Sequence, residues 1–156
     1  MQPIQTPITG EEAQGDLTRP TEALTQFYFG FNHRDLGTLA DNWSQTEEAA
    51  MDNPLGGVMR GWEAIRSVYE RIMRGPSQVF VEFYDYTIHE TAEMFYAVGR
   101  ERGFLRGPQG ELRLSIRTTR LFRKYDDRWK QAHHHGSIED PELLRRYQAM
   151  VRGETA

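Results

Sequence analysis

The stretch that decides the fold is residues 112–137, LRLSIRTTRLFRKYDDRWKQAHHHGS, in which apolar and polar side chains alternate along two runs. Such alternation is typical of strands with one buried face, and Tyr125-Asp126-Asp127 between the runs is typical of a hairpin turn. Two more strand-like runs precede them, at residues 79–88 and 93–105, and Gly107-Pro108-Gln109-Gly110 supplies another turn. The sequence therefore predicts a four-stranded antiparallel meander.

Three helical segments come before these strands. The first begins near Pro20 or Thr21, with Thr21 as its N-cap, and its apolar residues recur at three- and four-residue spacing. Asp35 can cap a short second helix, and a third spans residues 62–72 until Gly75-Pro76 ends it. The chain thus places its helices first and its sheet afterwards.

This order predicts an α+β fold: a cone-shaped, curved antiparallel sheet covered by three N-terminal helices, plus a short C-terminal helix opened by Asp140-Pro141. Residues 48–51 add a weakly marked short strand. The expected layout is a flexible N-terminal arm over residues 1–18, a single domain over 19–150 and a tail over 151–156. A pocket inside the cone is then the expected seat of function.

Val79-Phe80-Val81 places apolar side chains on both faces of its strand. A sheet covered by helices on one side does not need apolar residues on the other. We therefore expect the second face to meet another copy of the chain, which gives a symmetric homodimer.

Composition excludes several classes of function. The 156 residues carry a net charge of −4, which disfavours a nucleic-acid or an anionic-membrane partner. The absence of cysteine excludes disulfides, thiol nucleophiles and thiolate zinc sites. No apolar run approaches the roughly 20 residues that cross a bilayer, and residues 1–18 do not have the pattern of a signal peptide. We expect a cytoplasmic protein.

Four segments together resemble a known family. They are residues 31–36 (FNHRDL), 52–56 (DNPLG), 61–65 (GWEAI) and 129–137 (WKQAHHHGS). In this order they resemble the nuclear transport factor 2-like superfamily, in its SnoaL-like (polyketide cyclase and ketosteroid isomerase-like) branch. The resemblance implies a bent sheet covered by three helices, usually dimeric, around a hydrophobic cavity. It does not imply one activity, since the superfamily includes isomerases, cyclases, dehydratases and pure binding modules.

The loop at residues 52–56 looks most like the segment of ketosteroid isomerases that presents a proton-shuttling aspartate just before a proline. Aligned on Pro54, that position is Asn53, which has no carboxylate to accept a proton. Asp52 is the adjacent acid, but neighbours on extended backbone point to opposite faces unless a bulge intervenes. The first helix differs similarly, because Phe27 stands where those isomerases have a hydrogen-bonding tyrosine, and Tyr28 is next to it.

The histidine run offers further candidates. His133 and His135 lie on one strand face and His134 on the other. Imidazoles at this spacing can ligate a metal if a carboxylate converges on them, but no acid stands at a recognised spacing, and we expect no metal and no cofactor. One histidine capping the sheet end is the favoured structural alternative. If the pocket holds an acid or base, His135 is our choice, because histidine titrates near neutral pH.

Charged and aromatic residues complete the candidate site. A cross-strand Arg–Glu pair inside the cone is the simpler interpretation of the strand charges, and Glu101 lies on the opposite face to its neighbours Arg100 and Arg102. The alternative is that Arg117 or Arg100 faces the cavity and binds a carboxylate. Most aromatic residues are expected in the core, and the candidates for lining a ligand site are Trp43, Trp62, Tyr86 and Phe95.

Two functional hypotheses remain open. The first is an enzyme without a cofactor, an isomerase, cyclase or dehydratase that binds a small, partly apolar, oxygenated molecule. In it Asp52 or His135 moves the proton, Tyr28 polarises a carbonyl, and Asn53 and His133 line the site. The second is a non-catalytic ligand-binding or association module with the same pocket and dimer surface.

Overall fold

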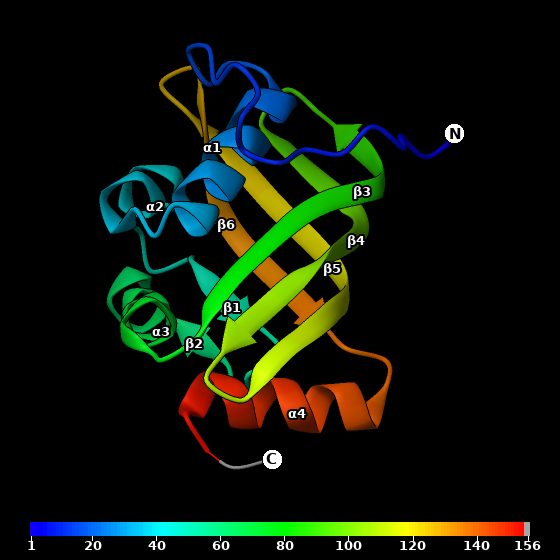
Figure 1. The fold of residues 1–156 in the computed structure, drawn as a ribbon. Helices are drawn as coiled ribbons and strands as arrows, with labels where there is room; N and C mark the ends of the chain where they lie inside the picture. Colours follow the sequence, from blue (N-terminus) through cyan, green and yellow to red (C-terminus); the bar gives the residue numbers. More distant parts are fainter. Residues whose placement is uncertain (155–156) are drawn as a thin grey trace.

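The computed structural model describes residues 1–154, which form a curved sheet with helices packed on one side and across one end (Figure 1). This is the α+β cone expected from the sequence. The elements of this part of the chain are α1 Pro20–Asn32, α2 Leu36–Asn42, β1 Ala50–Asp52, β2 Met59–Arg60, α3 Trp62–Arg74, β3 Gln78–Glu90, β4 Met94–Gly107, β5 Gly110–Tyr125, β6 Arg128–Ser137 and α4 Pro141–Arg152.

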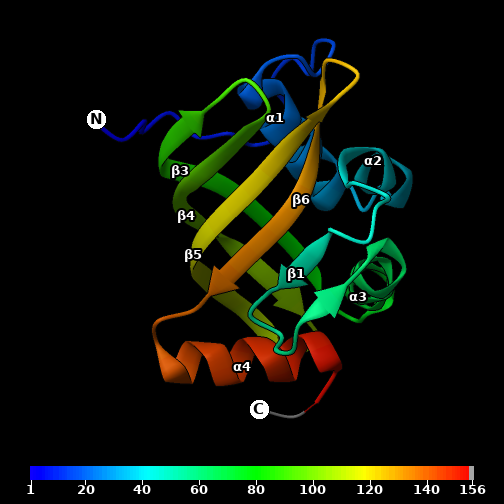
Figure 2. The same ribbon diagram turned by 180° about the vertical axis from the view of Figure 1, so that it is seen from behind.

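The sheet of the described residues has six strands in the order β2-β1-β6-β5-β4-β3. The antiparallel meander β3–β6 agrees with the sequence prediction. The weakly marked strand expected at residues 48–51 corresponds to β1, but its pairing was not predicted. β1 runs parallel to β6, with Ala50 opposite His133 and Asp52 opposite His135, and β2, which was not predicted, pairs antiparallel with β1. Figure 2 shows β1 alongside β6 on this side of the sheet.

The helix ends follow from local chemistry. Asp35 accepts a hydrogen bond from the Thr38 backbone amide and caps α2 as predicted, and Asp140 caps α4 in the same way. The start of α1 differs from the prediction, since its N-cap is Arg19 and not Thr21. Pro20 occupies the first turn, where its missing amide hydrogen costs nothing, and the Glu22 carboxylate accepts the Arg19 amide.

The two faces of the sheet differ along every strand. We call the face that packs on the helices the inner face, and the opposite one the outer face. On β5 the buried positions are 112, 114, 116, 118, 120 and 122, while the alternate positions are more exposed. A bulge in β3 resets this alternation, because Asp85 has a φ of 50° and Tyr86 then turns inward to be buried.

The first 18 residues are docked and do not form the loose arm expected from the sequence. Ile4 pairs with Tyr86 and Ile8 with Phe83, so this segment adds backbone hydrogen bonds to the exposed edge of β3. Leu17 is buried, and its carbonyl accepts the Trp129 amide. Backbone hydrogen bonds to the open edge of β3, together with the burial of Ile8 and Leu17, attach this segment to the sheet.

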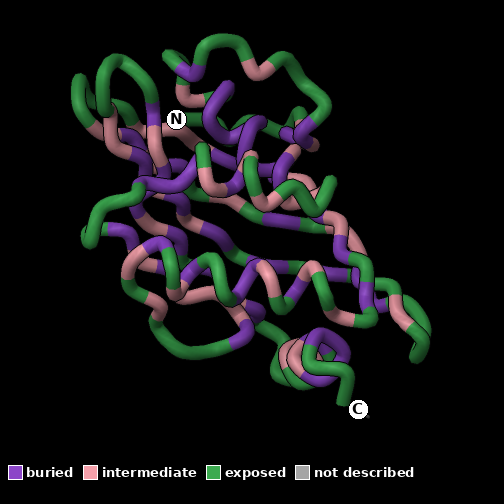
Figure 3. The backbone as a smooth tube through the Cα atoms, turned by 90° about the vertical axis from the view of Figure 1, so that its left-hand side faces the viewer, coloured by how far each residue is buried: buried purple, intermediate pink, exposed green. Residues whose placement is uncertain are grey.

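The core lies between the helices and the inner face, where the buried segments are concentrated in Figure 3. α4 lies across one end of the sheet and contacts β4 and β5. It continues to Arg152, so the first residues of the expected tail are helical, and residues 155–156 of that tail lie outside the described part. Within residues 1–154, no helix is long and apolar enough to span a membrane.

Candidate functional site

A small cavity lies between the inner face, α1, α3 and α4. Its volume is about 40 Å³, which is room for a few water molecules and far less than the roughly 300–1,000 Å³ of typical ligand pockets. Apolar side chains of the core make most of its wall, among them Phe27, Phe31 and Ile116. Its polar lining comes from Glu101, Arg120, His134, Asn53, Tyr69 and Tyr147.

Glu101 and Arg120 form a fully buried ion pair beside this cavity. The Arg120 guanidinium donates to Glu101 Oε1 at 2.8 Å, and the Tyr28 hydroxyl donates to the same oxygen at 2.6 Å. Arg120 Nε also donates to the Tyr28 oxygen at 3.1 Å. Both bonds to the carboxylate end on Oε1, so Oε2 accepts no hydrogen bond from any described residue.

The surroundings stabilise the charge on Arg120. Its guanidinium lies 3.6 Å from the centre of the Phe27 ring, a cation–π contact, and it donates to Gln131 at 2.8 Å. Burial alone would lower the pKa of Arg120, but Tyr28 and Glu101 outweigh it and raise that pKa above its usual value. Burial raises the pKa of the Tyr28 hydroxyl well above 10.0. Arg120 is therefore a fixed cation and Tyr28 a fixed neutral donor.

His134 is the second polar group of the cavity. It faces Arg120 across the β5–β6 ladder and Met51 across the β6–β1 ladder, and it is buried. Neither of its ring nitrogens has a hydrogen-bond partner in residues 1–154. Burial, followed by the charge of Arg120, lowers the pKa of His134 well below 6.5. The imidazole is therefore neutral at physiological pH and keeps one donor and one acceptor free.

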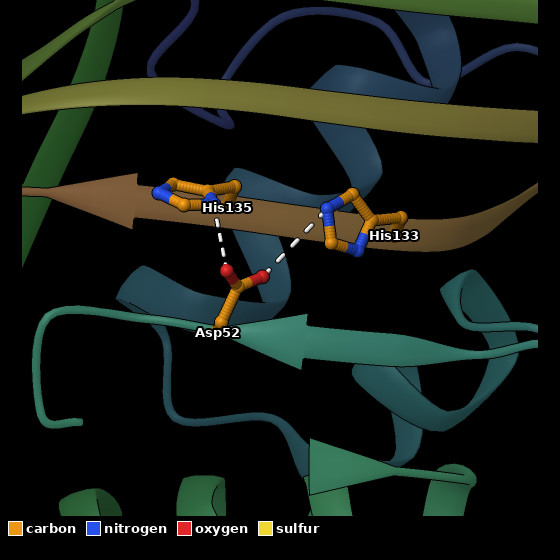
Figure 4. A group of neighbouring side chains, drawn as sticks. All are labelled: Asp52, His133 and His135. Atoms are coloured by element: carbon orange, nitrogen blue, oxygen red, sulfur yellow. Dashed lines mark ion pairs between the residues drawn. The ribbon is translucent and has the colours of Figure 1, made fainter. Parts of the chain in front are cut away.

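Of the loop residues considered from the sequence, Asn53 lines the cavity and Asp52 does not. Asp52, His133 and His135 instead lie together on the outer face, where the Asp52 carboxylate is 2.6 Å from His135 Nδ1 and 3.7 Å from His133 Nε2 (Figure 4). The prediction that His135 is the histidine facing the cavity is wrong. Its neighbour His134 takes that position, because β6 alternates strictly between faces at this point.

The aromatic candidates are packed in the core away from the cavity lining. The Trp43 indole donates to the Tyr69 hydroxyl, and Phe95 stacks on Phe122. Tyr86 stacks on Phe83, and Trp62 is buried at the start of α3. Tyr28 also stays outside the lining, and Phe27 next to it faces the cavity. The ligand-contact and catalytic roles assigned to these residues remain predictions, to which this geometry lends no support.

The charged residues on the strands also differ in position from what the sequence predicted. The predicted Arg–Glu pair inside the cone exists, but its arginine is Arg120. Arg117 pairs with Glu139 on the outer face and Arg100 pairs with Asp85, so neither reaches the cavity. Positions 117 and 120 differ by an odd number of residues on one strand, and their side chains therefore point to opposite faces.

Sequence reasoning missed Arg120 and His134 as cavity residues, although a signal was present. Leu112, Leu114 and Ile116 mark the buried face of β5, and counting on in steps of two reaches Arg120. Counting in steps of two along β6 from Trp129 does not identify the inward-facing histidine, because Gln131 and Ala132 are both buried at a register shift. No count within β6 therefore identified which histidine faces inward.

The chain has recognisable relatives. A family model described as a SnoaL-like domain matches residues 21–141. No curated protein matches the chain. Among solved structures, a candidate dehydratase of the NTF2-like family from Streptomyces avermitilis is similar at 22% identity and a TM-score of 0.68, covering 78% of this chain and 94% of that one.

Two further solved structures share the fold. A ketosteroid isomerase-like protein from Erwinia carotovora atroseptica is 16% identical with a TM-score of 0.65, over 81% of this chain and 98% of that chain. A candidate calcium/calmodulin-dependent protein kinase type II association domain from Thiobacillus denitrificans is 22% identical with a TM-score of 0.64, over 78% and 95%. At such low identity the similarity shows a common fold, and the function must be argued from the side chains.

Proposed function

We propose that this chain, which belongs to the SnoaL-like branch of the nuclear transport factor 2-like superfamily, binds a small oxygen-bearing molecule in the cavity between its helices and its sheet. The observation that carries this proposal is His134, a buried imidazole whose two nitrogens have no partner in the described chain. A buried polar group without a hydrogen bond is costly, and a hydroxyl or carbonyl oxygen of a ligand would remove that cost.

The charges around the cavity favour a neutral ligand. Glu101 and Arg120 compensate each other at 2.8 Å, and the lowered pKa of His134 keeps its ring uncharged. A charged ligand would lose its hydration without gaining an unpaired opposite charge. An alcohol with an apolar body suits the free Glu101 Oε2, to which its hydroxyl can donate, together with the neutral imidazole and the aromatic wall, and a ketone suits the imidazole and the wall.

Binding such a molecule requires the wall to move, because the cavity is smaller than the ligand. Tyr147 of α4 and Asn53-Pro54 of the adjoining loop form one side of the wall. The helix and the loop are linked, since Gln148 donates to the Pro54 carbonyl and Arg152 to the Leu55 carbonyl. We propose that α4 and this loop move together to admit the ligand.

Turnover is a second candidate function, as a cofactor-independent isomerase, cyclase or dehydratase. The neutral His134 beside Arg120 favours it, since either ring nitrogen can exchange a proton with a bound substrate. Two features weigh against it: the lowered pKa makes His134 a weak base, and Glu101 Oε1 already accepts hydrogen bonds from Tyr28 and Arg120. Binding without turnover is therefore the function that this geometry supports best.

A matched pair of tryptophan variants tests the binding proposal. Ile116→Trp fills the cavity, and Ser115→Trp places the same ring on the outer face of the same strand. We expect cyclohexanone, a neutral probe, to shift the NMR signals of the His134 ring in the wild type and in Ser115→Trp, but not in Ile116→Trp. Cyclohexanecarboxylate should bind more weakly. An equal response in Ile116→Trp, or tighter binding of the anion, contradicts the proposal.

We also propose that the outer face meets a second copy of the chain, as the sequence suggested. Phe80 and Phe104 stack there at 5.6 Å between ring centres, and Val98 is 42% exposed. A pair of such faces would remove these apolar groups from water. Sedimentation at micromolar concentration should give twice the chain mass of 18.2 kDa, and a value of one chain mass contradicts this. The cytoplasm remains the proposed location.

A further inference from the structure

Three ligand-type side chains converge on the outer face, where β1 runs parallel to β6. Asp52 is in register with His135, and its carboxylate reaches toward His133 as well (Figure 4). One possible ligand atom from each of the three residues lies within 4.8 Å of the other two. Two of these residues are only two positions apart, but the carboxylate comes from a strand far earlier in the chain.

The hydrogen bonds of His133 leave a repulsive contact in this group. His133 Nδ1 is 2.9 Å from the Ala50 carbonyl oxygen, which can only accept, so Nδ1 carries the hydrogen. In the neutral ring Nε2 then presents a lone pair to Asp52 Oδ1, 3.7 Å away. That oxygen is buried and has no hydrogen-bond partner in the described structure. Two acceptors therefore face each other across a gap that a cation would fill.

The size of the gap suits a metal ion. Zinc binds imidazole nitrogen at about 2.0–2.1 Å and carboxylate oxygen at about 2.0–2.2 Å, so two ligands of one ion lie roughly 3–4 Å apart. The 3.7 Å between His133 and Asp52 is within that range. His135 Nδ1, at 2.6 Å from the carboxylate, is too close to it for both to bind one ion. Its side chain is 57% exposed and can rotate into a ligand position.

We propose that Asp52, His133 and His135 bind a divalent transition-metal ion, with Zn²⁺ the best match to two imidazoles and a carboxylate. Three protein ligands leave at least one coordination position open. His135 also lines an open groove of about 540 Å³ on the outer face, together with Arg100, Arg117 and Ser137.

This site is separate from the cavity, because the sheet lies between them. Asp52, His133 and His135 belong to the outer face, and their neighbours Met51 and His134 line the cavity. The metal proposal therefore does not rest on the proposed ligand of the cavity. It revises the expectation of no metal from the sequence, because the parallel pairing of β1 with β6 brings Asp52 to the two histidines.

Titration of the full-length, EDTA-treated protein with ZnCl₂ in a calorimeter tests the proposal. We expect one Zn²⁺ per chain in the wild type, and an affinity at least about tenfold weaker in each of Asp52→Asn, His133→Ala and His135→Ala. CoCl₂ should give the visible absorption of a low-coordinate Co²⁺ site in the wild type and lose it in the same variants. Far-UV circular dichroism checks that every variant is folded.

His33→Ala is the matched control. His33 forms an exposed pair with Glu11 at 2.6 Å, so it tests whether any surface His–carboxylate pair binds the ion. This variant should bind Zn²⁺ as the wild type does. The proposal is overturned if the wild type binds no Zn²⁺, if any one of the three site variants keeps full affinity, or if His33→Ala loses as much as they do.

Discussion

Histidines on the two faces of the sheet have opposite surroundings. His134 points inward, is buried without a hydrogen-bond partner in residues 1–154, and has its pKa lowered well below 6.5 by burial and by Arg120. His133 and His135, its neighbours on either side, point outward to one carboxylate and are 39% and 57% exposed. A change of one position on a strand thus separates a neutral cavity residue from a candidate metal ligand.

The arginines of β5 give the sharpest test of this contrast. Arg120→Met leaves the buried Glu101 carboxylate without its cation and should lower the free energy of unfolding by about 3–5 kcal/mol. Arg117→Met removes an exposed pair with Glu139 and should cost at most about 1 kcal/mol. Urea denaturation measures both. Adding Glu101→Gln to Arg120→Met should recover part of the loss, and similar costs for the two single variants would refute the contrast.

His134 should make the stability of the protein depend on pH. The folded pKa of His134 is below its unfolded value of about 6.5, so below that pH the unfolded chain takes up a proton that the folded chain does not. Above about pH 6.5 the neutral imidazole makes its full contribution to the free energy of unfolding. As the pH falls from there toward the folded pKa, this contribution decreases by at most about 1.4 kcal/mol per pH unit.

Removing the inner imidazole should therefore flatten the acid side of the stability profile. We expect His134→Leu to lose less stability than the wild type between about pH 6.5 and the acid transition, as measured by urea denaturation at several pH values. Thr119→Val, which removes no ionisable group, serves as the control and should keep the wild-type slope. An unchanged slope in His134→Leu would mean that the inner imidazole is protonated while folded.

Two adjacent threonines of β5 extend the comparison to uncharged groups. Thr118 is buried, and its hydroxyl has no hydrogen-bond partner in the part of the chain that the structure describes. Thr118→Val keeps the shape, removes this unsatisfied group and should stabilise the protein by up to about 1 kcal/mol. Thr119→Val, on the outer face, should change stability by less than about 0.5 kcal/mol. A clear loss in Thr118→Val would indicate a bound water at that hydroxyl.

The smallest effect on stability is expected at Asp52. Its Oδ1 has no hydrogen bond within residues 1–154, and its Oδ2 forms only an ion pair, at 2.6 Å, with the exposed ring of His135. Asp52→Asn should therefore shift the metal-free free energy of unfolding by no more than about 1 kcal/mol, since the pair is partly exposed. Thermal denaturation with and without ZnCl₂ should show that this variant loses only the stabilisation by the metal. A large loss without metal would indicate a structural role for Asp52.

Much of the fold was predictable because the signals are local. The hairpin turns, the caps at Asp35 and Asp140 and the end of α3 at Gly75 each follow from residues close in sequence. The opposite faces of Asp52 and Asn53 followed from strand geometry alone. The docking of residues 1–18 was missed, because single apolar residues such as Ile4 and Ile8 have no periodicity that reveals a partner strand.

The two sites were only partly predictable. The sequence identified Asp52, Asn53, Glu101 and the histidines as the chemically interesting residues, and it expected an Arg–Glu pair inside the cone. It chose Arg117 or Arg100 as the cavity cation, whereas Arg120 takes that position. Positions 117 and 120 lie in one unbroken alternation of β5, so counting from Leu112 could have separated them, whereas the register shift between Leu121 and Phe122 in the ladder of β5 with β6 hides which histidine of β6 faces inward.

The sequence by itself determined the α+β class, the meander and the two-faced pattern of its strands, because these depend on the order of polar and apolar residues. Only the tertiary structure decided which side chains meet. The three residues of β1 carry too little pattern to predict a parallel partner, yet their pairing with β6 brings Asp52 to His133 and His135. Contacts between strands distant in the chain depend on the packing of the whole sheet, which no local pattern specifies.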